Sequence, residues 1–175
     1  MPYFFERRNW YLQSYSGDKL YFPFRNEYTN FYETAQKISG EEIGWDGLRD
    51  KTAEVCKLLS ISSGETETAE RMAAVVAEFG GRIGVTKSHP QFVEIINPGV
   101  SKASAIKILA QKFGVDKSEV MAIGDSDNDL PMLKAAGISV AMGNGTAEVK
   151  NSCDFVTGAC VDDGFAEAVD KYVLK

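Results

Sequence analysis

Three acidic side chains lie within five residues, directly after an apolar segment. Asp125, Asp127 and Asp129 follow the run Val120–Gly124, and the amide of Asn128 lies between the last two of them. Ligands of parallel α/β sheets bind outside the carboxyl ends of the strands, which is where this pattern places Asp125. Carboxylates this close repel one another unless a cation compensates, and a hard cation such as Mg²⁺ prefers oxygen ligands. The cluster therefore predicts a Mg²⁺ site.

The same residues also have a purely structural interpretation. Asp127, Asn128 and Asp129 are suited to a turn and to the N-cap of a helix that carries Pro131 in its first turn. We favour the structural role for Asp127. We favour metal binding for Asp125, because that residue lies at the strand tip and not in the cap.

A lysine and a glycine-rich turn complete the candidate site. Lys102 follows Ser101 at the expected start of a helix, where unpaired backbone N–H groups attract anions, and it adds a mobile positive charge. Gly143-Asn144-Gly145 follows the apolar run Ile138–Met142 and predicts a tight turn at the sheet edge where Asp125 lies. Neither feature is diagnostic alone, because most lysines at helix starts are solvated surface residues.

Short apolar strands and amphipathic helices alternate from Ser101 to Val173. These elements must position the side chains of the candidate site. Such alternation is typical of an α/β fold in which helices cover both faces of a parallel sheet. The expected elements are a helix from Ser101 that ends at Gly114, strand Val120–Gly124, a helix around Leu130–Ala136, strand Ile138–Met142, strand Phe155–Thr157 and a closing helix Phe165–Val173.

The first part of the chain has a different composition, since twelve of the nineteen aromatic residues fall in residues 1–32. Such a concentration is more typical of a sheet core than of a sugar-stacking platform. Strands Trp10–Tyr15 and Lys19–Phe24 flank a short glycine-containing turn and predict a hairpin. We expect Leu20, Phe22 and Phe24 on one buried face, and Pro23 to place the strand end at a sheet edge.

Two helices and three further strands follow the hairpin. Each helix is expected to end at a glycine, the first at Gly40 and the second at Gly80-Gly81. The strands are expected at Glu54–Ser60, Arg82–Thr86 and Phe92–Ile96. We predict an α+β module over residues 8–97, an antiparallel sheet with helices on one face, and a domain boundary near residue 98.

Bulk properties exclude several classes of function. The net charge is −6 and the basic residues are scattered, which argues against a surface that follows nucleic-acid phosphates. No apolar run approaches membrane-spanning length. The three cysteines, Cys56, Cys153 and Cys160, form no C-x-x-C pair, so neither a disulfide framework nor a zinc site is indicated. We expect a cytoplasmic globular protein.

Three motifs in a fixed order resemble the haloacid-dehalogenase superfamily: V-S-K at 100–102, G-D-S-D-N-D at 124–129 and A-M-G-N at 141–144. The Cof-type sugar-phosphate phosphatase branch is the most similar, because YSGDKLY, FVEIINPGVSK and DFVTGACVDDGFAEAV also resemble it. The GD-x-x-ND string is specific, whereas the lysine alone is not. The resemblance implies a C2-type α+β cap domain with an entry linker over residues 1–97. It implies that residues 98–175 form the C-terminal part of a Rossmann-like core.

The resemblance also implies a reaction, the Mg²⁺-dependent hydrolysis of a small phosphate monoester through an aspartyl-phosphate. Asp125 would bind Mg²⁺, and Asp129 would support the metal through water or by orienting its neighbours. Asn128 would hydrogen-bond the phosphate. Lys102 would neutralise the phosphoryl group and the attacking carboxylate. Ala103 stands where family members carry glycine, a mild departure.

The family's nucleophile motif, D-x-D followed by Gly-Thr, is absent. The only D-x-D strings are Asp125-Ser126-Asp127 and the overlapping Asp127-Asn128-Asp129, which both belong to the fourth family motif, and the Ser/Thr of the second motif is missing as well. We therefore expect that Met1 is an artificial or alternative start at the entry to the cap, and that the chain alone is inactive. An apolar edge along Val120–Ile123 should then cause self-association or pairing with a separate N-terminal piece.

Two other functions compete with an enzyme. A catalytically dead binding or interaction module could keep the metal and phosphate contacts without the nucleophile. A response-regulator-like receiver also combines aspartates with a lysine, but receivers place their acidic residues before the lysine. His89, the only histidine, fits a loop surface better than a substrate contact. The sequence leaves the substrate open.

Overall fold

The computed structural model describes residues 1–51 and 55–174. The chain divides into two compact units, Met1–Pro98 and Gly99–Lys175, each described here by itself. No helix in the described ranges is both long and apolar enough to cross a membrane.

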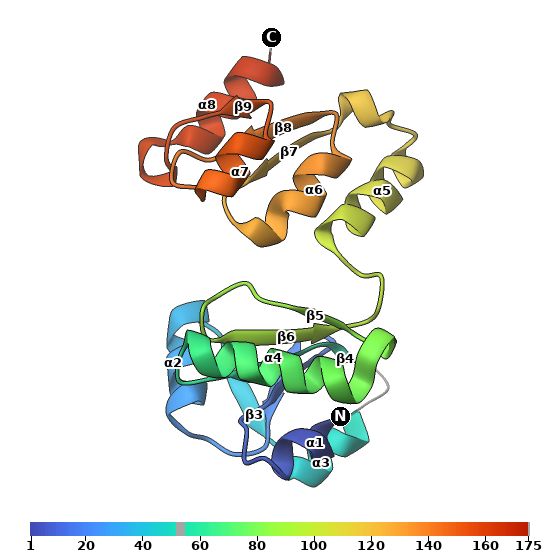
Figure 1. Ribbon diagram of the computed structural model, residues 1–175, viewed down its shortest axis with the longest axis vertical. Coiled ribbons are helices and arrows are strands. Elements are labelled where there is room, and N and C mark those ends of the chain that lie inside the picture. Colours follow the sequence, from blue (N-terminus) through green and yellow to red (C-terminus); the bar gives the residue numbers. More distant parts are fainter. Residues whose placement is uncertain (52–54, 175) are drawn as a thin grey trace. The chain divides into compact units, whose positions relative to one another are not determined.

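The first unit is built on a six-stranded sheet in the order β3-β2-β1-β4-β6-β5 (Figure 1). Neighbouring strands are antiparallel except β2 and β3, which are parallel. The strands are β1 Gln13–Ser16, β2 Lys19–Phe22, β3 Gly40–Glu42, β4 Val55–Ile61, β5 Gly84–Thr86 and β6 Phe92–Ile96. Of the residues expected in β4, Glu54 lies outside the described ranges.

The predicted hairpin is confirmed. Ser16 pairs with Lys19, so the loop consists of two residues, and the first of them, Gly17, has a φ of 57°. Positive φ at this position is what a tight hairpin turn of this length requires, and glycine supplies it without strain.

The expected edge at Pro23 is wrong. Strand β2 ends at Phe22, and β3 pairs with the side of β2 that faces away from β1, so β2 is an inner strand. Leu20 and Phe22 are buried as expected, but Phe24 lies beyond the strand end and is exposed. Pro23 follows the last paired residue, where the missing N–H costs no ladder bond.

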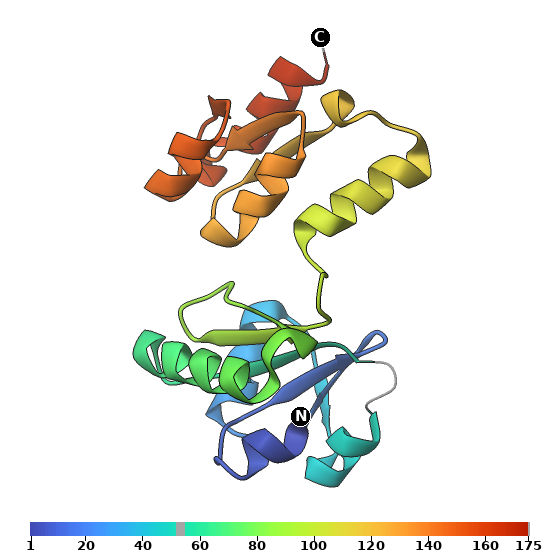
Figure 2. The same ribbon diagram turned by 45° about the vertical axis from the view of Figure 1, so that its right-hand side comes forward.

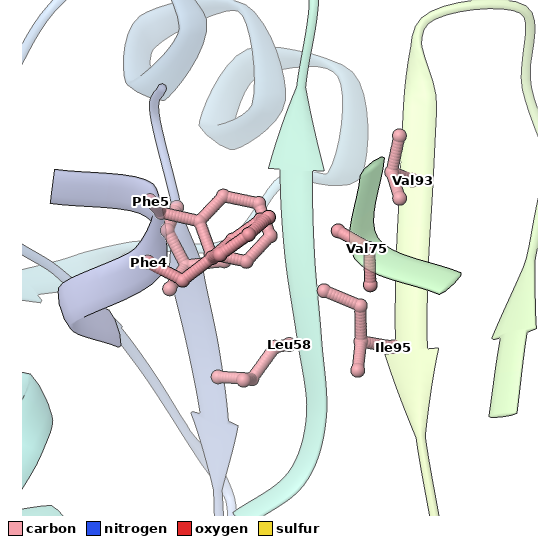
Figure 3. Close-up of a cluster of buried hydrophobic side chains, with 7 residues drawn as sticks. Phe4, Phe5, Leu58, Val75, Val93 and Ile95 are labelled. Atoms are coloured by element: carbon pink, nitrogen blue, oxygen red, sulfur yellow. The ribbon is translucent and has the colours of Figure 1, made fainter. Parts of the chain in front are cut away.

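Helices cover both faces of this sheet, so the expectation of helices on one face is also wrong. The helices of the unit are α1 Pro2–Glu6, α2 Glu27–Gln36, α3 Gly44–Asp50 and α4 Glu65–Phe79. On one face, side chains of α1 and α4 pack on β4 and β6; Figure 3 labels Phe4, Phe5, Leu58, Val75, Val93 and Ile95 of this cluster. On the other face, Tyr32 of α2 packs on Phe92 and Tyr15.

The two long helices of this unit end differently. Helix α4 ends at Gly80, whose φ is 51°, as expected. Helix α2 ends at Lys37, which adopts the left-handed conformation with a φ of 54°, so the expected glycine stop at Gly40 is wrong. Gly40 instead lies in β3, where a Cβ would come within 2.7 Å of the Phe22 ring. The glycine serves close packing and not the helix end.

The second unit carries a parallel sheet in the order β7-β8-β9, as the α/β prediction requires. The bounds follow the expected ones within two residues, and the short helix α7 was not predicted. The elements are α5 Lys102–Phe113, β7 Met121–Gly124, α6 Leu130–Ala135, β8 Ile138–Ala141, α7 Ala147–Ser152, β9 Phe155–Val156 and α8 Gly164–Tyr172.

Both faces of the second sheet bear helices (Figures 1 and 2). One core cluster joins Ala122 and Ala141 of the strands to Leu133 of α6 and Val149 of α7, with Ile106 of α5 packed against it. On the opposite face, Phe155 of β9 stacks on Tyr172 of α8, with ring centroids 4.4 Å apart.

Strand β7 lies at the edge of this sheet and pairs only with β8 within the described ranges. A groove of about 370 Å³ runs between the edge and α5, and apolar side chains line most of it. Leu109 and Phe113 of α5 are 50% and 70% exposed there. The second unit therefore presents an unpaired strand edge next to an apolar helix face.

The left-handed residue at the end of α2 generates a prediction. Replacing Lys37 by glycine should raise the free energy of unfolding by about 1 kcal/mol, because a residue with a Cβ is strained in this conformation. Chemical denaturation followed by circular dichroism measures the change. The matched control is Gly114→Ala at the end of α5, where φ is 66°; it should destabilise by a similar amount. A destabilised Lys37→Gly variant would contradict the argument.

Candidate active site

A reciprocal cap fixes the start of α5 and with it the position of Lys102. The Ser101 hydroxyl accepts a hydrogen bond from the Ser104 N–H at 3.0 Å, and the Ser104 hydroxyl accepts one from the Ser101 N–H at 2.8 Å. This is a capping box in which serine replaces the usual glutamate. Lys102 is the first residue of the helix, and its side chain is 57% exposed.

Asp129 is the buried centre of the site, with 5% of its side chain exposed. One carboxylate oxygen accepts a hydrogen bond from Lys102 Nζ at 2.5 Å. The other accepts from the backbone N–H groups of Asp125 and Ser126, each at 3.2 Å. Gly124 makes room for the carboxylate, because a Cβ there would lie 2.7 Å from the Asp129 Cβ. One carboxylate thus ties the helix-borne lysine to the loop that follows β7.

The surroundings of Asp129 keep it ionised. Burial by itself raises the pKa of this carboxyl group, but the hydrogen bonds from Lys102 and from the two backbone N–H groups outweigh burial and hold the pKa below its ordinary value of 3.8. Asp129 therefore carries a negative charge at neutral pH, and the ammonium group of Lys102 is hydrogen-bonded to it.

Asp125, at the tip of β7, presents its carboxylate to solvent. One oxygen accepts a hydrogen bond from the Ser126 hydroxyl at 3.2 Å, and the other accepts from Asn144 Nδ2 at 3.3 Å. Each oxygen can accept a further partner. Close by in the chain, Asn128 Oδ1 is buried and has no hydrogen-bond donor among the described residues. A buried amide oxygen without a hydrogen-bond donor lowers the stability of the fold by about 1–3 kcal/mol. Binding of a ligand to this atom would therefore be favourable.

These oxygen atoms fit part of a Mg²⁺ shell. Carboxylate and amide oxygens suit Mg²⁺, which usually keeps several waters. Asp125 and Asn128 offer such oxygens, whereas Asp129 already uses its oxygens on Lys102 and the backbone. Within residues 1–51 and 55–174, no group of three or more His, Cys, Asp or Glu side chains could hold a metal ion. The residues of this chain can thus supply part of the coordination shell of Mg²⁺. Asp129 is better placed to orient neighbouring residues than to bind the metal directly.

The structure brings Lys102, Asp125 and Asp129 into one hydrogen-bonded network, with Asn128 in the same loop. Asp127 has a separate partner, because its carboxylate accepts a hydrogen bond from the Thr146 hydroxyl at 2.6 Å. The turn expected at Asp127 is present as the 3₁₀ turn Asp127–Asp129, but the N-cap of that turn is Ser126.

Sequence reasoning missed two contributors to this site. Thr146 is the N-cap of the unpredicted helix α7, and its residue type was an available signal. The backbone N–H of Cys160, which holds Asn144, has no signal in the sequence.

His89 lies in the first unit, in the loop before β6. Its Nδ1 accepts a hydrogen bond from the Gln91 N–H at 3.3 Å, and its ring lies 4.6 Å from the Phe92 ring centroid. The imidazole is therefore part of an aromatic cluster on the sheet.

The depressed pKa of Asp129 generates a prediction on stability. Asp129→Asn should lower the free energy of unfolding at pH 7 by about 2 kcal/mol, the scale of a hydrogen bond to a charged group. Because the folded pKa lies below 3.8, the stabilisation is present above pH 3.8 and is lost as pH falls through the folded pKa. Denaturation of both proteins from pH 7 to pH 2.5 measures the gap, which should narrow as the pH falls below 3.8. Asp170→Asn, an exposed change on α8, is the control and should show no such gap. A gap that stays constant with pH would contradict the assignment of the charge.

Comparison with known proteins identifies the family of this chain. The family model described as haloacid dehalogenase-like hydrolase matches residues 2–169. A putative phosphatase of Streptococcus pyogenes serotype M6 is 33% identical over 144 residues, which cover 82% of this chain and 49% of the relative. A 5-amino-6-(5-phospho-D-ribitylamino)uracil phosphatase of Bacillus subtilis is 41% identical over 90 residues, which cover 51% of this chain and 36% of that protein.

A solved structure shares the fold over almost the whole chain. The crystal structure of a haloacid dehalogenase-like hydrolase from Bacteroides thetaiotaomicron matches with a TM-score of 0.84 and 30% identity. The match covers 95% of this chain and 62% of that one, so this chain spans half or less of the two relatives above and under two thirds of the solved one. The resemblance seen in the three motifs is confirmed, and the chain belongs to the haloacid dehalogenase-like hydrolase family.

Proposed function

We propose that this chain supplies the lysine side and part of the metal side of the active site in a Mg²⁺-dependent phosphatase for small phosphate monoesters. The observation that carries the proposal is the network in which Asp129 joins Lys102 to the backbone of Asp125 at the carboxyl end of a parallel strand. An ammonium group and a metal-binding carboxylate are thereby held at one sheet edge, which is what a transferring phosphoryl group needs.

Each residue has a role in this proposal. Lys102 binds a phosphoryl oxygen, and Asp129 keeps the ammonium group in place. Asn128 binds phosphate through its amide NH₂ group or the metal through its orphaned Oδ1 atom. Asp125 holds Mg²⁺, which when bound neutralises charge on the phosphoryl oxygens. Because the chain is acidic overall, Lys102 and the metal supply the local positive charge.

The relatives support a small monoester as the substrate. The Bacillus relative is named for a compound with a phosphate on a ribityl chain, which agrees with the sugar-phosphate class that the motifs suggest. We assign the first unit the role of a substrate-selecting cap and the second that of the C-terminal part of the core. We also retain the expectation of a cytoplasmic protein without nucleic-acid or membrane partners.

The nucleophile must come from elsewhere, because the sequence contains no D-x-D outside the loop of Asp125. We propose that a segment with the nucleophilic carboxylate adds to β7 as a parallel strand and covers the groove beside α5. A strand added there would end at the same edge as Asp125. The exposed Leu109 and Phe113 and the longer chains of the relatives support this occupant.

Phosphate binding tests the role of Lys102. The 175-residue chain should bind inorganic phosphate in the presence of Mg²⁺, and Lys102→Ala should weaken binding about tenfold or more, since hydrogen bonds to charged groups contribute about 1.5–3 kcal/mol. Two-dimensional NMR titration measures the dissociation constants. Lys107→Ala, an exposed lysine of the same helix, is the matched control and should not change the affinity. Equal affinities for Lys102→Ala and wild type would refute the proposed site.

A phosphatase assay tests whether the chain by itself lacks the nucleophile. The chain by itself should not hydrolyse p-nitrophenyl phosphate with Mg²⁺, because its sequence has no D-x-D outside the Asp125 loop to supply the nucleophile of the aspartyl-phosphate. Colorimetric assay at high protein concentration measures this, with a complete member of the family as the positive control. Turnover at a rate similar to that of the control would overturn the expectation. The segment with the nucleophilic carboxylate can then be added. If the chain still binds phosphate but does not hydrolyse the substrate, a non-catalytic binding module is favoured.

A further inference from the structure

Asn144 lies in the turn between β8 and α7, and both ends of its side-chain amide are engaged. Its Oδ1 accepts a hydrogen bond from the backbone N–H of Cys160 at 2.8 Å, and its Nδ2 donates to Asp125 Oδ2 at 3.3 Å. A backbone N–H can only donate, so the oxygen of the amide must face Cys160. The NH₂ group is therefore directed at the Asp125 carboxylate.

The same turn contacts the loop of Asp125 at two further points. The Thr146 N–H donates to the Asp125 carbonyl oxygen at 3.0 Å, and the Thr146 hydroxyl donates to Asp127 at 2.6 Å. At Gly145, an added Cβ would lie 3.2 Å from the Asp125 carbonyl oxygen. The turn after β8 thus packs directly against the loop after β7.

The turn is itself held from the other side by the segment that follows β9. The Gly143 N–H donates to the Gly158 carbonyl oxygen at 2.9 Å. A Cβ on Gly143 would lie 2.7 Å from the Ala159 nitrogen, so the two segments touch through their backbones. Asn144 therefore links this segment to the exposed carboxylate of Asp125.

We propose that Asn144 is a positioning residue that fixes the carboxylate of Asp125 for Mg²⁺, with the Cys160 N–H as its anchor. This inference rests on the proposed function. A solvent-exposed aspartate can rotate among several rotamers, and the bond to Oδ2 selects one of them and leaves lone pairs of both oxygens for a cation. A neutral amide suits this task, because a lysine here would compete with the cation and an aspartate would repel the carboxylate.

Magnesium titration of the ¹⁵N-labelled chain tests the inference. Two-dimensional NMR detects affinities in the millimolar range, and NaCl at matched ionic strength corrects for unspecific salt effects. In the wild type, the side-chain NH₂ resonances of Asn144 should shift saturably with MgCl₂. Asn144→Ala should raise the dissociation constant for Mg²⁺ about tenfold, the scale at which partners of metal ligands act. Asn151→Ala, an exposed asparagine of α7, should leave it unchanged.

A second pair of variants tests the anchor alone. Cys160 is the first residue of a 3₁₀ turn, and Ala159 before it has φ −70° and ψ 163°, a conformation that accepts a following proline. Cys160→Pro should therefore fold, lose the N–H that holds Asn144 and weaken Mg²⁺ binding severalfold. Cys160→Ala keeps the N–H and should bind as the wild type does. Thermal unfolding of all variants shows whether they fold.

The outcomes separate this inference from the proposed function. Unchanged Mg²⁺ affinity in both Asn144→Ala and Cys160→Pro, with binding abolished by Asp125→Asn, would overturn the positioning role alone. Equal weakening by Cys160→Pro and Cys160→Ala would also overturn it, since the N–H would then be irrelevant. No saturable Mg²⁺ binding by the wild type would overturn the metal site and this inference together.

Discussion

The carboxylate of Asp129 is ionised although it is almost wholly buried. The second unit supplies the cation, the hydrogen-bond donors and the space that a buried carboxylate needs. A buried charge needs a partner and hydrogen-bond donors, which here are Lys102 and the N–H groups of Asp125 and Ser126. Gly124 leaves the space for it, and the capped start of α5 brings the lysine within reach. The direction in which the chain leaves β7, and hence the place of Asp125, follows from satisfying this one group.

The loops after β7 and β8 and the segment after β9 meet because the three strands are parallel. Their carboxyl ends lie at one edge, so segments far apart in the chain contact one another there. Glycines at 143 and 145 allow the backbones to approach closely, and polar side chains of the turn after β8 reach the acidic loop. The site is thus built from loops whose positions a rigid sheet determines. The oxygen of Asn128 is the one buried side-chain polar atom of that loop for which the described residues offer no partner.

The first unit shows where local sequence patterns suffice and where they fail. The hairpin, α4 and the strand Phe92–Ile96 were predicted because turn glycines and residue periodicity are local signals. The second helical layer was not predicted, because burial of both faces of the sheet depends on where α2 packs. The left-handed Lys37 and the close packing of Gly40 against Phe22 likewise depend on tertiary contacts.

The sequence by itself determined the family, the α/β order of the second unit and the identity of the polar residues at its strand ends. These features are encoded in short motifs and in the periods of apolar residues, and both are local. Only the tertiary structure decided how the residues are connected: that Asp129 bonds to Lys102, that Asp127 bonds to Thr146, and that the Cys160 N–H orients Asn144 toward Asp125. Such contacts join residues 16 to 27 positions apart, and their geometry exists only once the sheet has brought its loops together.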